Sequence, residues 1–442
     1  MLARNLATTA ASRIIALPLS FAASLALARL LGAEQRGVLA LAILIPTTIY
    51  LFGGLGLATA QVVFAGKHPE KRGAIAFQSI AFSVCLGLVT LCFYWYVLEF
   101  RPVWFERFEV VGVRNHILAA FIVLFYRAYS NLSAGVLGAN RIPVVNIAEV
   151  LVPFSKMALV VALVWWLNMS VTGGVLVHLG SFVFLAVYMA IATMVKVPVR
   201  TWKPDLAFFT KSITFGLKNY LHHVALFFAS RIGIFMVAYL IADSDRAVGH
   251  FTLASQFAIM IWVLPQSMQT TFLPHLSVTQ ADRGKLSVRM TRILFLALIP
   301  VFVALVLGSP VIPLLAGQDY AESVAPFVWF LPGMLLLGAI QPLGAYLTYI
   351  EKPMYGVFAV WMGAVVNVVS NYVLIPRMGI SGAAVALSLS NLMMGVIIVG
   401  CFRYETKIPL SLFALRWSDV NEILGMANKV INKVARRRST KT

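Results

Sequence analysis

Four basic residues lie inside long apolar stretches of the sequence, where a charge is costly. Arg127 lies ten residues from each end of its stretch, and Lys156 about twelve from each end of the next. Arg231 lies about 15 Å from one end of a third stretch, and Lys218 lies near the other end. A charge at that depth costs at least ~2.5–3.5 kcal/mol unless it faces water, a partner or a ligand. Their chemistry would be anion binding, because guanidinium groups hold phosphate oxygens bidentately.

Acidic partners for these cations are scarce, since Glu149 is the one carboxylate inside an apolar stretch. We therefore expect water and an anionic substrate to satisfy the excess positive charge. The helix face of Arg127 also carries small and polar residues, which is typical of a face directed into a protein interior or cavity. These residues are Ser130, Asn131, Ala134 and Gly138.

The candidate site combines the cations with two histidines. We expect Arg127, Arg231, Lys156, Lys218 and His222 to bind substrate, and Glu149 and His223 to serve any coupling to ions.

For several of these residues a second interpretation stays open. Lys218 lies close enough to the end of its span to extend toward the membrane surface. Lys156 is seven residues from Glu149 on one helix face, so the two could form a water-bridged structural pair. The histidines could be packed core residues. For Arg127 and Arg231 a role in a cavity is favoured.

No motif for enzymatic chemistry accompanies these residues. The sequence contains no Walker A motif, no metal-ligand cluster and no nucleophile elbow, and its three cysteines match no metal or redox spacing. We expect no catalytic residue, no metal and no cofactor.

The composition indicates a membrane protein. Of 442 residues, 60% are hydrophobic and 12% are charged, whereas soluble domains are nearer half apolar and a quarter charged. The net charge of +19 would suggest nucleic acid binding in a soluble protein. With this apolar content, orientation in a membrane and contact with anionic lipids explain the charge better, and no nucleic acid partner is expected.

Twelve apolar stretches are each long enough to cross a membrane as a helix. They are residues 14–31, 38–65, 74–98, 117–137, 144–167, 173–195, 215–241, 248–272, 293–309, 325–350, 355–375 and 380–402. With the N-terminus in the cytoplasm, 24 Lys and Arg residues fall on the cytoplasmic side and seven on the outer side. This bias predicts that both termini are cytoplasmic.

The stretches repeat along the chain. Gly37-Val-Leu-Ala-Leu-Ala opens the second stretch, and Gly249-His-Phe-Thr-Leu-Ala opens the eighth, 212 residues later. Thr172-Gly-Gly and Ser381-Gly-Ala each open the sixth stretch of a half, 209 residues apart. We therefore predict an all-α polytopic membrane protein with twelve transmembrane helices in two pseudo-symmetric six-helix halves around a central cavity. The halves would be residues 1–203 and 204–404.

Residues 405–442 would form a cytoplasmic tail. Apolar residues recur at helical spacing from Trp417 to Val434, and Lys429, Lys433 and Arg436–Arg438 follow or interleave. This pattern predicts a basic amphipathic helix on the cytoplasmic leaflet, with a frayed basic tail as the alternative.

Several motifs resemble those of one family of transporters. Asn367-Val-Val-Ser-Asn-Tyr-Val-Leu-Ile-Pro376, followed by Gly379-Ile-Ser-Gly-Ala-Ala384, is similar to the junction of spans 11 and 12 in Wzx-type polysaccharide flippases. Ala28-Arg-Leu-Leu-Gly32 with Arg36-Gly-Val looks like that family's span 1–2 junction, and Leu264-Pro-Gln with Phe272-Leu-Pro looks like its eighth span.

The resemblance implies a flippase of the multidrug/oligosaccharidyl-lipid/polysaccharide exporter superfamily in the bacterial inner membrane. Such proteins move undecaprenyl-pyrophosphate-linked oligosaccharide repeat units to the periplasmic leaflet for O-antigen, capsule or exopolysaccharide synthesis. They work by alternating access with a cationic cavity, beside a polysaccharide polymerase and a chain-length regulator. Arg231 falls where the family often has an arginine, whereas Gly233 replaces a frequent acidic residue, which puts a local proton-coupling partner in doubt.

Two other functions remain as alternatives. A cation-coupled multidrug exporter of the same superfamily should have an acidic membrane site, and this chain has one carboxylate against three deep cations. A membrane-embedded polysaccharide polymerase would hold its chemistry in a large outer loop. The longest such loop here, residues 99–116, is short but contains three arginines.

Overall fold

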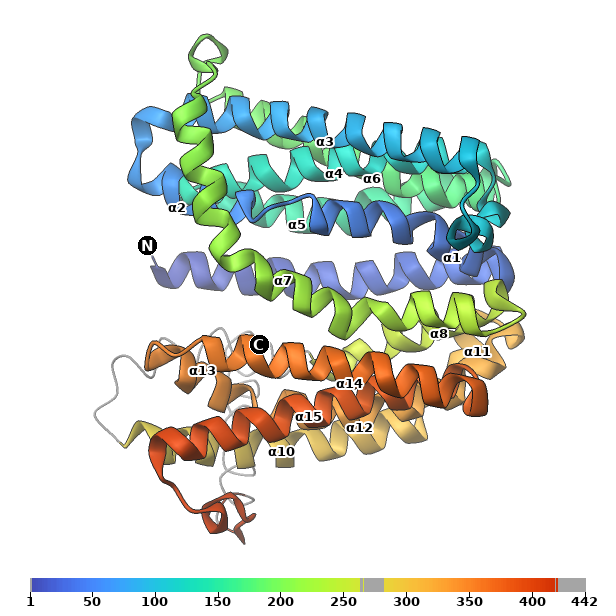
Figure 1. Ribbon diagram of the computed structural model, residues 1–442, viewed down its shortest axis with the longest axis vertical. Coiled ribbons are helices and arrows are strands. Elements are labelled where there is room, and N and C mark those ends of the chain that lie inside the picture. Colours follow the sequence, from blue (N-terminus) through green and yellow to red (C-terminus); the bar gives the residue numbers. More distant parts are fainter. Residues whose placement is uncertain (1, 263–264, 266–281, 418, 420–442) are drawn as a thin grey trace, which may run out of the picture. The chain divides into compact units, whose positions relative to one another are not determined.

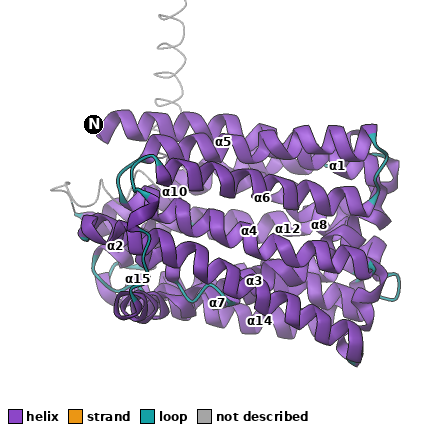
Figure 2. Cartoon of the chain, turned by 90° about the horizontal axis from the view of Figure 1, so that it is seen from above, coloured by secondary structure: helices purple, strands orange, loops and turns teal. Residues whose placement is uncertain are grey.

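The computed structural model describes residues 2–262, 265, 282–417 and 419. Within these residues every regular element is a helix, and no strand occurs (Figure 2). This is the structure expected of a chain that crosses a lipid bilayer, because a helix satisfies its backbone hydrogen bonds internally.

The long helices follow the apolar stretches of the sequence. The first part of the chain contains α1 (Leu2–Phe52), α2 (Leu57–Lys67), α3 (Arg72–Phe100), α4 (Val113–Gly138), α5 (Ile142–Leu159), α6 (Val171–Met194), α7 (Leu206–Leu240) and α8 (Ser244–Ala258). The remainder contains α10 (Arg283–Leu307), α11 (Val311–Ala316), α12 (Val324–Ala339), α13 (Gln341–Tyr349), α14 (Met354–Met378) and α15 (Ile380–Thr406).

Nine helical stretches among the described residues are long and apolar enough to cross a membrane. One of them, residues 15–52, contains a non-helical Gly32 and covers the first predicted span and part of the second. The predicted all-α polytopic membrane fold is confirmed. The count of twelve spans is consistent with these helices, but it stays a prediction, since within the described chain α7 contains only two shorter apolar runs and α8 is not among the candidate spans.

The chain divides into two compact units. The first contains residues 1–227, 241–252 and 313–320, and the second contains residues 228–240, 253–312 and 321–442. The boundary therefore falls inside α7, between Phe227 and Phe228. The two six-helix halves proposed from the sequence repeat remain a prediction.

In the first unit, α4 is the central helix, packed against α1, α2, α3 and α6, while α5 covers α1 and α6 (Figure 1). The second unit is built on α15, which packs along α14 and α12, and α10 completes the layer against α12. A buried apolar cluster that includes Leu343, Leu347 and Phe402 lies at one end of this unit.

The second predicted span is interrupted at Gly53–Gly56, where α1 ends and α2 begins. The last four carbonyls of a helix have no partner within it, and hydrocarbon offers none. At the end of α1 all four are satisfied. The amides of Gly53 and Gly54 donate to Ile49 and Leu51. The guanidinium of Arg127 donates to the carbonyl of Tyr50, and the hydroxyl of Tyr220 donates to that of Phe52.

Residues 410–417 and 419 of the predicted tail are attached to the second unit. Asp419 is buried and pairs with Arg292 of α10, with 2.8 Å between a carboxylate oxygen and Nε. The same carboxylate accepts a second guanidinium hydrogen bond at 3.0 Å. Residues 420–442, which carry most of the predicted amphipathic helix, lie outside the described residues.

Two glycines that the sequence repeat pairs with each other are in backbone contact in the first unit. A Cβ on Gly37 would lie 1.6 Å from the carbonyl oxygen of Asp245, and a Cβ on Gly249 would lie 1.9 Å from that of Ala33. Each glycine also lies close to the other's amide nitrogen. The start of α8 therefore packs directly on the backbone of α1.

We predict that Gly37→Ala destabilises the protein by roughly 1–3 kcal/mol, because the new methyl group must displace backbone rather than a flexible side chain. Gly400→Ala in α15 is the matched control, since no described residue lies within 4 Å of a Cβ there. Thermal unfolding of the purified variants in detergent measures the difference. Equal unfolding temperatures for the two variants would contradict the contact.

Candidate functional site

Arg127 is buried at the centre of the first unit. Arg127 is 4% exposed. Its guanidinium lies over the ring of Tyr50, 4.1 Å from the ring centroid, and also donates a hydrogen bond to the backbone carbonyl of Tyr50. A Cβ on Gly54 would lie 2.3 Å from the guanidinium, so the interruption of α1 leaves the space that this group fills. Among the described residues, Nε of Arg127 has no hydrogen-bond partner.

A stack of aromatic rings joins Arg127 to Lys156. Tyr50 of α1 stacks on Tyr126 of α4, with 3.8 Å between ring centroids. Tyr126 in turn stacks on Phe182 of α6 at 4.2 Å, and the ammonium of Lys156 in α5 lies 5.6 Å from the Phe182 centroid. Ring faces attract cations, so the stack stabilises a positive charge at each end. Two candidate residues that are 29 positions apart therefore belong to one cluster.

Polar residues extend this cluster on the predicted face of α4. The hydroxyl of Tyr50 donates to Ser130 at 3.0 Å. Asn131 is fully buried, and in the part of the chain that the structure describes neither its amide nitrogen nor its oxygen has a hydrogen-bond partner. Buried amides are normally satisfied, so this face is suited to ordered water or a polar ligand group.

Glu149 is engaged away from Lys156. Ser12 of α1 donates to its carboxylate at 3.3 Å, and one turn earlier Thr9 donates to the side-chain oxygen of Asn146 at 3.1 Å. Glu149 thus belongs to a polar contact between α5 and the start of α1. The interactions recorded for Lys156 in the described chain are its contact with the Phe182 ring and an electrostatic one with His178, and neither a hydrogen bond nor an ion pair with Glu149 is recorded.

Arg231 differs from Arg127 in its surroundings. It lies on α7 in the second unit and is exposed, and the structure records no hydrogen bond or ion pair between it and the residues described. The side chains of Lys218, His222 and His223 lie outside the described residues, so their predicted roles remain predictions.

Sequence analysis did not identify the rings of the stack. Tyr126 is next to Arg127 in sequence and lies at the same depth, which is a usable signal. Tyr50 and Phe182 carry no such signal, because aromatic residues are common in apolar helices and their distance from Arg127 in space depends on how α1 and α6 pack.

A sequence match over most of the chain identifies the family to which the protein belongs. Residues 26–325 match a family described as polysaccharide biosynthesis protein. The chain belongs to this family. No curated protein matches the sequence.

The fold of this chain is similar to that of solved structures of other proteins. A multidrug resistance MATE transporter of the MOP superfamily, in an inward-facing conformation, is similar with a TM-score of 0.75 and 14% identity, covering 87% of this chain and 94% of that one. The lipid II flippase MurJ, in an inward closed conformation, is similar with a TM-score of 0.75 and 14% sequence identity. The match covers 92% of this chain and 88% of the MurJ chain. The expected family of polysaccharide biosynthesis proteins is confirmed, and the predicted all-α polytopic fold is the one that these two solved structures have.

We predict that Arg127→Gln lowers the unfolding free energy by about 2 kcal/mol, because it removes a charged hydrogen bond to a helix-end carbonyl and a cation–π contact. Arg231→Gln should leave stability unchanged, since Arg231 is exposed and has no recorded partner. Thermal unfolding in detergent compares the two variants. An Arg127→Gln protein that unfolds at the wild-type temperature would show that the end of α1 does not need the hydrogen bond from this side chain.

Proposed function

We propose that the protein is a flippase that moves undecaprenyl-pyrophosphate-linked oligosaccharide repeat units from the cytoplasmic to the periplasmic leaflet of the bacterial inner membrane. Both termini lie in the cytoplasm, and transport proceeds by alternating access of a cationic cavity. The family, which is one of polysaccharide biosynthesis proteins, and the fold shared with a flippase support this proposal.

The observation that carries the proposal is the state of Arg231. Its guanidinium is exposed on an apolar helix and has no recorded carboxylate or carbonyl partner among the described residues. A guanidinium in that position would be costly against lipid, so it faces water and a ligand in the working protein. A pyrophosphate fits it, because the two planar N–H pairs bind phosphate oxygens bidentately.

Arg127 and Lys156 contribute in a different manner. Their charges are held at the ends of the Tyr50–Tyr126–Phe182 stack, so they give the first unit a fixed positive potential. We infer that this cluster attracts the head group and that Arg231 binds its phosphates, with Lys218 and His222 as further ligands.

The energetics permit transport without ATP. With the cell interior negative, outward movement of an anion is downhill by about 2.3 kcal/mol per charge per 100 mV. The polyprenyl tail would stay in lipid while the sugar crosses. Coupling to protons through Glu149 or His223 is a further proposal, although Glu149 is already hydrogen-bonded to Ser12.

A cation-coupled drug exporter is less well supported. Such a protein needs a carboxylate free to bind cationic cargo, and Glu149 is engaged in the contact between α5 and α1. The proposal therefore retains an anionic cargo.

We predict that Arg231→Ala abolishes flipping at normal expression, with at least a tenfold loss of surface polysaccharide in a strain that lacks the gene. Arg231→Lys should retain part of the activity, because it keeps the charge but loses bidentate binding. Full-length single repeat units should accumulate on the cytoplasmic leaflet. Arg200→Ala, at an exposed loop arginine, is the matched control.

Two results would contradict this proposal. Wild-type polysaccharide from Arg231→Ala would remove the proposed ligand. Single repeat units that reach the periplasm but stay unpolymerised in the deletion strain would indicate a polymerase.

A further inference from the structure

The first unit contains a cavity of about 340 Å³ that is separate from the ring stack. It lies where one end of α2 and α3 approaches α4, the start of α5 and the end of α6. Thirteen residues line it, among them Arg72, Ser79, Leu132, Ala139, Arg141 and Lys196.

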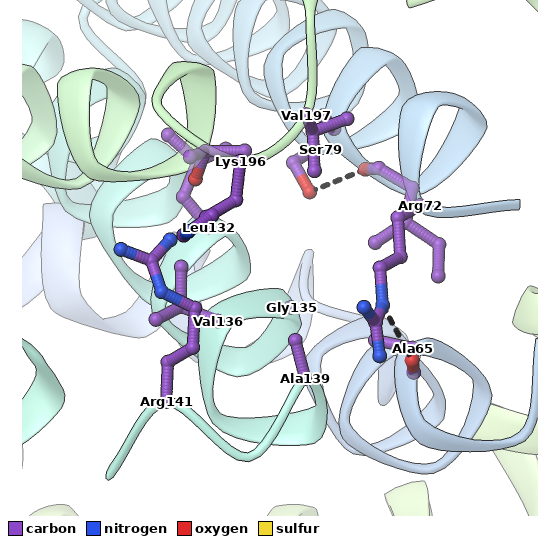
Figure 3. A pocket seen from close by; sticks show the side chains of 13 residues that line it. Ala65, Arg72, Ser79, Leu132, Gly135, Val136, Ala139, Arg141, Lys196 and Val197 are labelled. Atoms are coloured by element: carbon purple, nitrogen blue, oxygen red, sulfur yellow. Dashed lines mark hydrogen bonds between the residues drawn. The ribbon is translucent and has the colours of Figure 1, made fainter. Parts of the chain in front are cut away.

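Three cations converge on this cavity from two sides. Figure 3 shows Arg72 on one wall and Arg141 and Lys196 on the opposite wall. None of the thirteen residues described as lining it is acidic. The orientation proposed from the sequence puts all three cations at the cytoplasmic end of the spans.

The arginines are positioned by helix ends and retain free donors. Nε of Arg72 donates to the carbonyl of Ala65, in the last turn of α2, at 3.0 Å. Nη1 of Arg141 donates to the carbonyl of Ala192, in the last turn of α6. Each guanidinium uses one N–H group for this bond. In the described chain the structure records no hydrogen bond or ion pair from the other N–H groups of the two guanidiniums, and none from the Lys196 ammonium.

Two carboxylates close in sequence to Arg72 and Lys196 are already paired elsewhere, and Glu149, the nearest to Arg141, accepts a hydrogen bond from Ser12. Glu70 lies 3.3 Å from His68, and Asp205 lies 2.7 Å from the ammonium of Lys71. The hydrogen bond from Lys71 holds the pKa of Asp205 below its ordinary value, so this carboxylate stays ionised and occupied at neutral pH. The three cations of the cavity are therefore left without an acidic partner among the described residues.

The remaining wall is apolar. Ile75, Leu132, Val136 and Val197 supply hydrocarbon surface, and Ser79 is fully buried with its hydroxyl already bonded to Gln61 and Ile75. The volume is within the range of ligand sites and exceeds what a single phosphate needs. Cations at the rim of an apolar cavity fit a ligand that has an anionic head and a hydrocarbon body.

We propose that this cavity binds the phosphate group of a membrane lipid from the cytoplasmic leaflet. Arg72 and Arg141 hold the phosphate oxygens from opposite sides, Lys196 neutralises the remaining charge, and the first carbons of the lipid occupy the apolar wall. The proposal does not rest on the flipping activity, because the cavity lies within one unit and needs no transport cycle to be occupied.

The test measures lipid binding to the purified full-length protein by native mass spectrometry in a neutral detergent. The probes are phosphatidylglycerol, undecaprenyl pyrophosphate, phosphatidylcholine and inorganic pyrophosphate. We expect one or both of the first two to bind, and their relative affinity identifies the source of the phosphate. Phosphatidylcholine, with no net charge, should bind at least tenfold more weakly.

Variants locate the site. Arg72→Gln and Arg141→Gln should each raise the apparent Kd at least about tenfold, since each removes charged hydrogen bonds to the phosphate. Ala139→Phe should weaken binding by filling the cavity with all charges retained, which separates occupancy of the cavity from loss of charge, and thermal unfolding of each variant checks that it is folded. Arg200→Gln and Lys203→Gln, at exposed positions outside the cavity, are the matched controls.

Three outcomes would overturn the proposal. Equal binding of phosphatidylcholine would remove the role of the cations. Inorganic pyrophosphate bound as tightly as its lipid-linked form would remove the role of the apolar wall. Unchanged binding in Arg72→Gln, Arg141→Gln and Ala139→Phe would place the lipid elsewhere. Each readout is binding alone, so a failed flipping assay does not affect it.

Discussion

The absence of water from the hydrocarbon core is the constraint on which the rest of this structure depends. Every helix end and every charge within the membrane must find a partner in the chain or in a ligand. The interruption of α1 illustrates this requirement. Its carbonyls at Tyr50 and Phe52 would be unsatisfied in lipid, and side chains from α4 and α7 supply their donors. A local break in one helix therefore fixes the packing of two others.

The same constraint sorts the deep cations by role. Arg127 is satisfied by a carbonyl and a ring, and Lys156 by a ring alone. Arg231 has neither in the described chain. A cation that is satisfied by the protein stabilises the fold and contributes potential, whereas one that is unsatisfied needs a ligand. The sequence predicts substrate binding for both Arg127 and Arg231, whereas in the structure their surroundings differ: Arg127 has partners within the protein, and Arg231 has no recorded partner among the described residues.

The positions of most helices could be predicted from the sequence, because apolar length alone determines whether a stretch can cross a bilayer. The depth of Arg127 and the polar helix face that it shares with Ser130 and Asn131 could be predicted for the same reason. The interruption of the second span was not, since Gly53–Gly56 is tolerated only because Arg127 and Tyr220 reach it from far away in sequence. The cluster of Arg72, Arg141 and Lys196 could not be predicted either. The sequence indicates on which side of the membrane a loop charge lies, but not which loop charges lie close together in space.

The most direct test of the central claim is transbilayer movement in vesicles that contain the purified protein and an undecaprenyl-pyrophosphate-linked oligosaccharide. The fraction of sugar accessible to a membrane-impermeant reagent is followed over time for wild type and Arg231→Ala. We predict movement well above that in protein-free vesicles for wild type, and none above it for Arg231→Ala. Movement at the protein-free rate for wild type, or equal movement for the two proteins, would contradict the account.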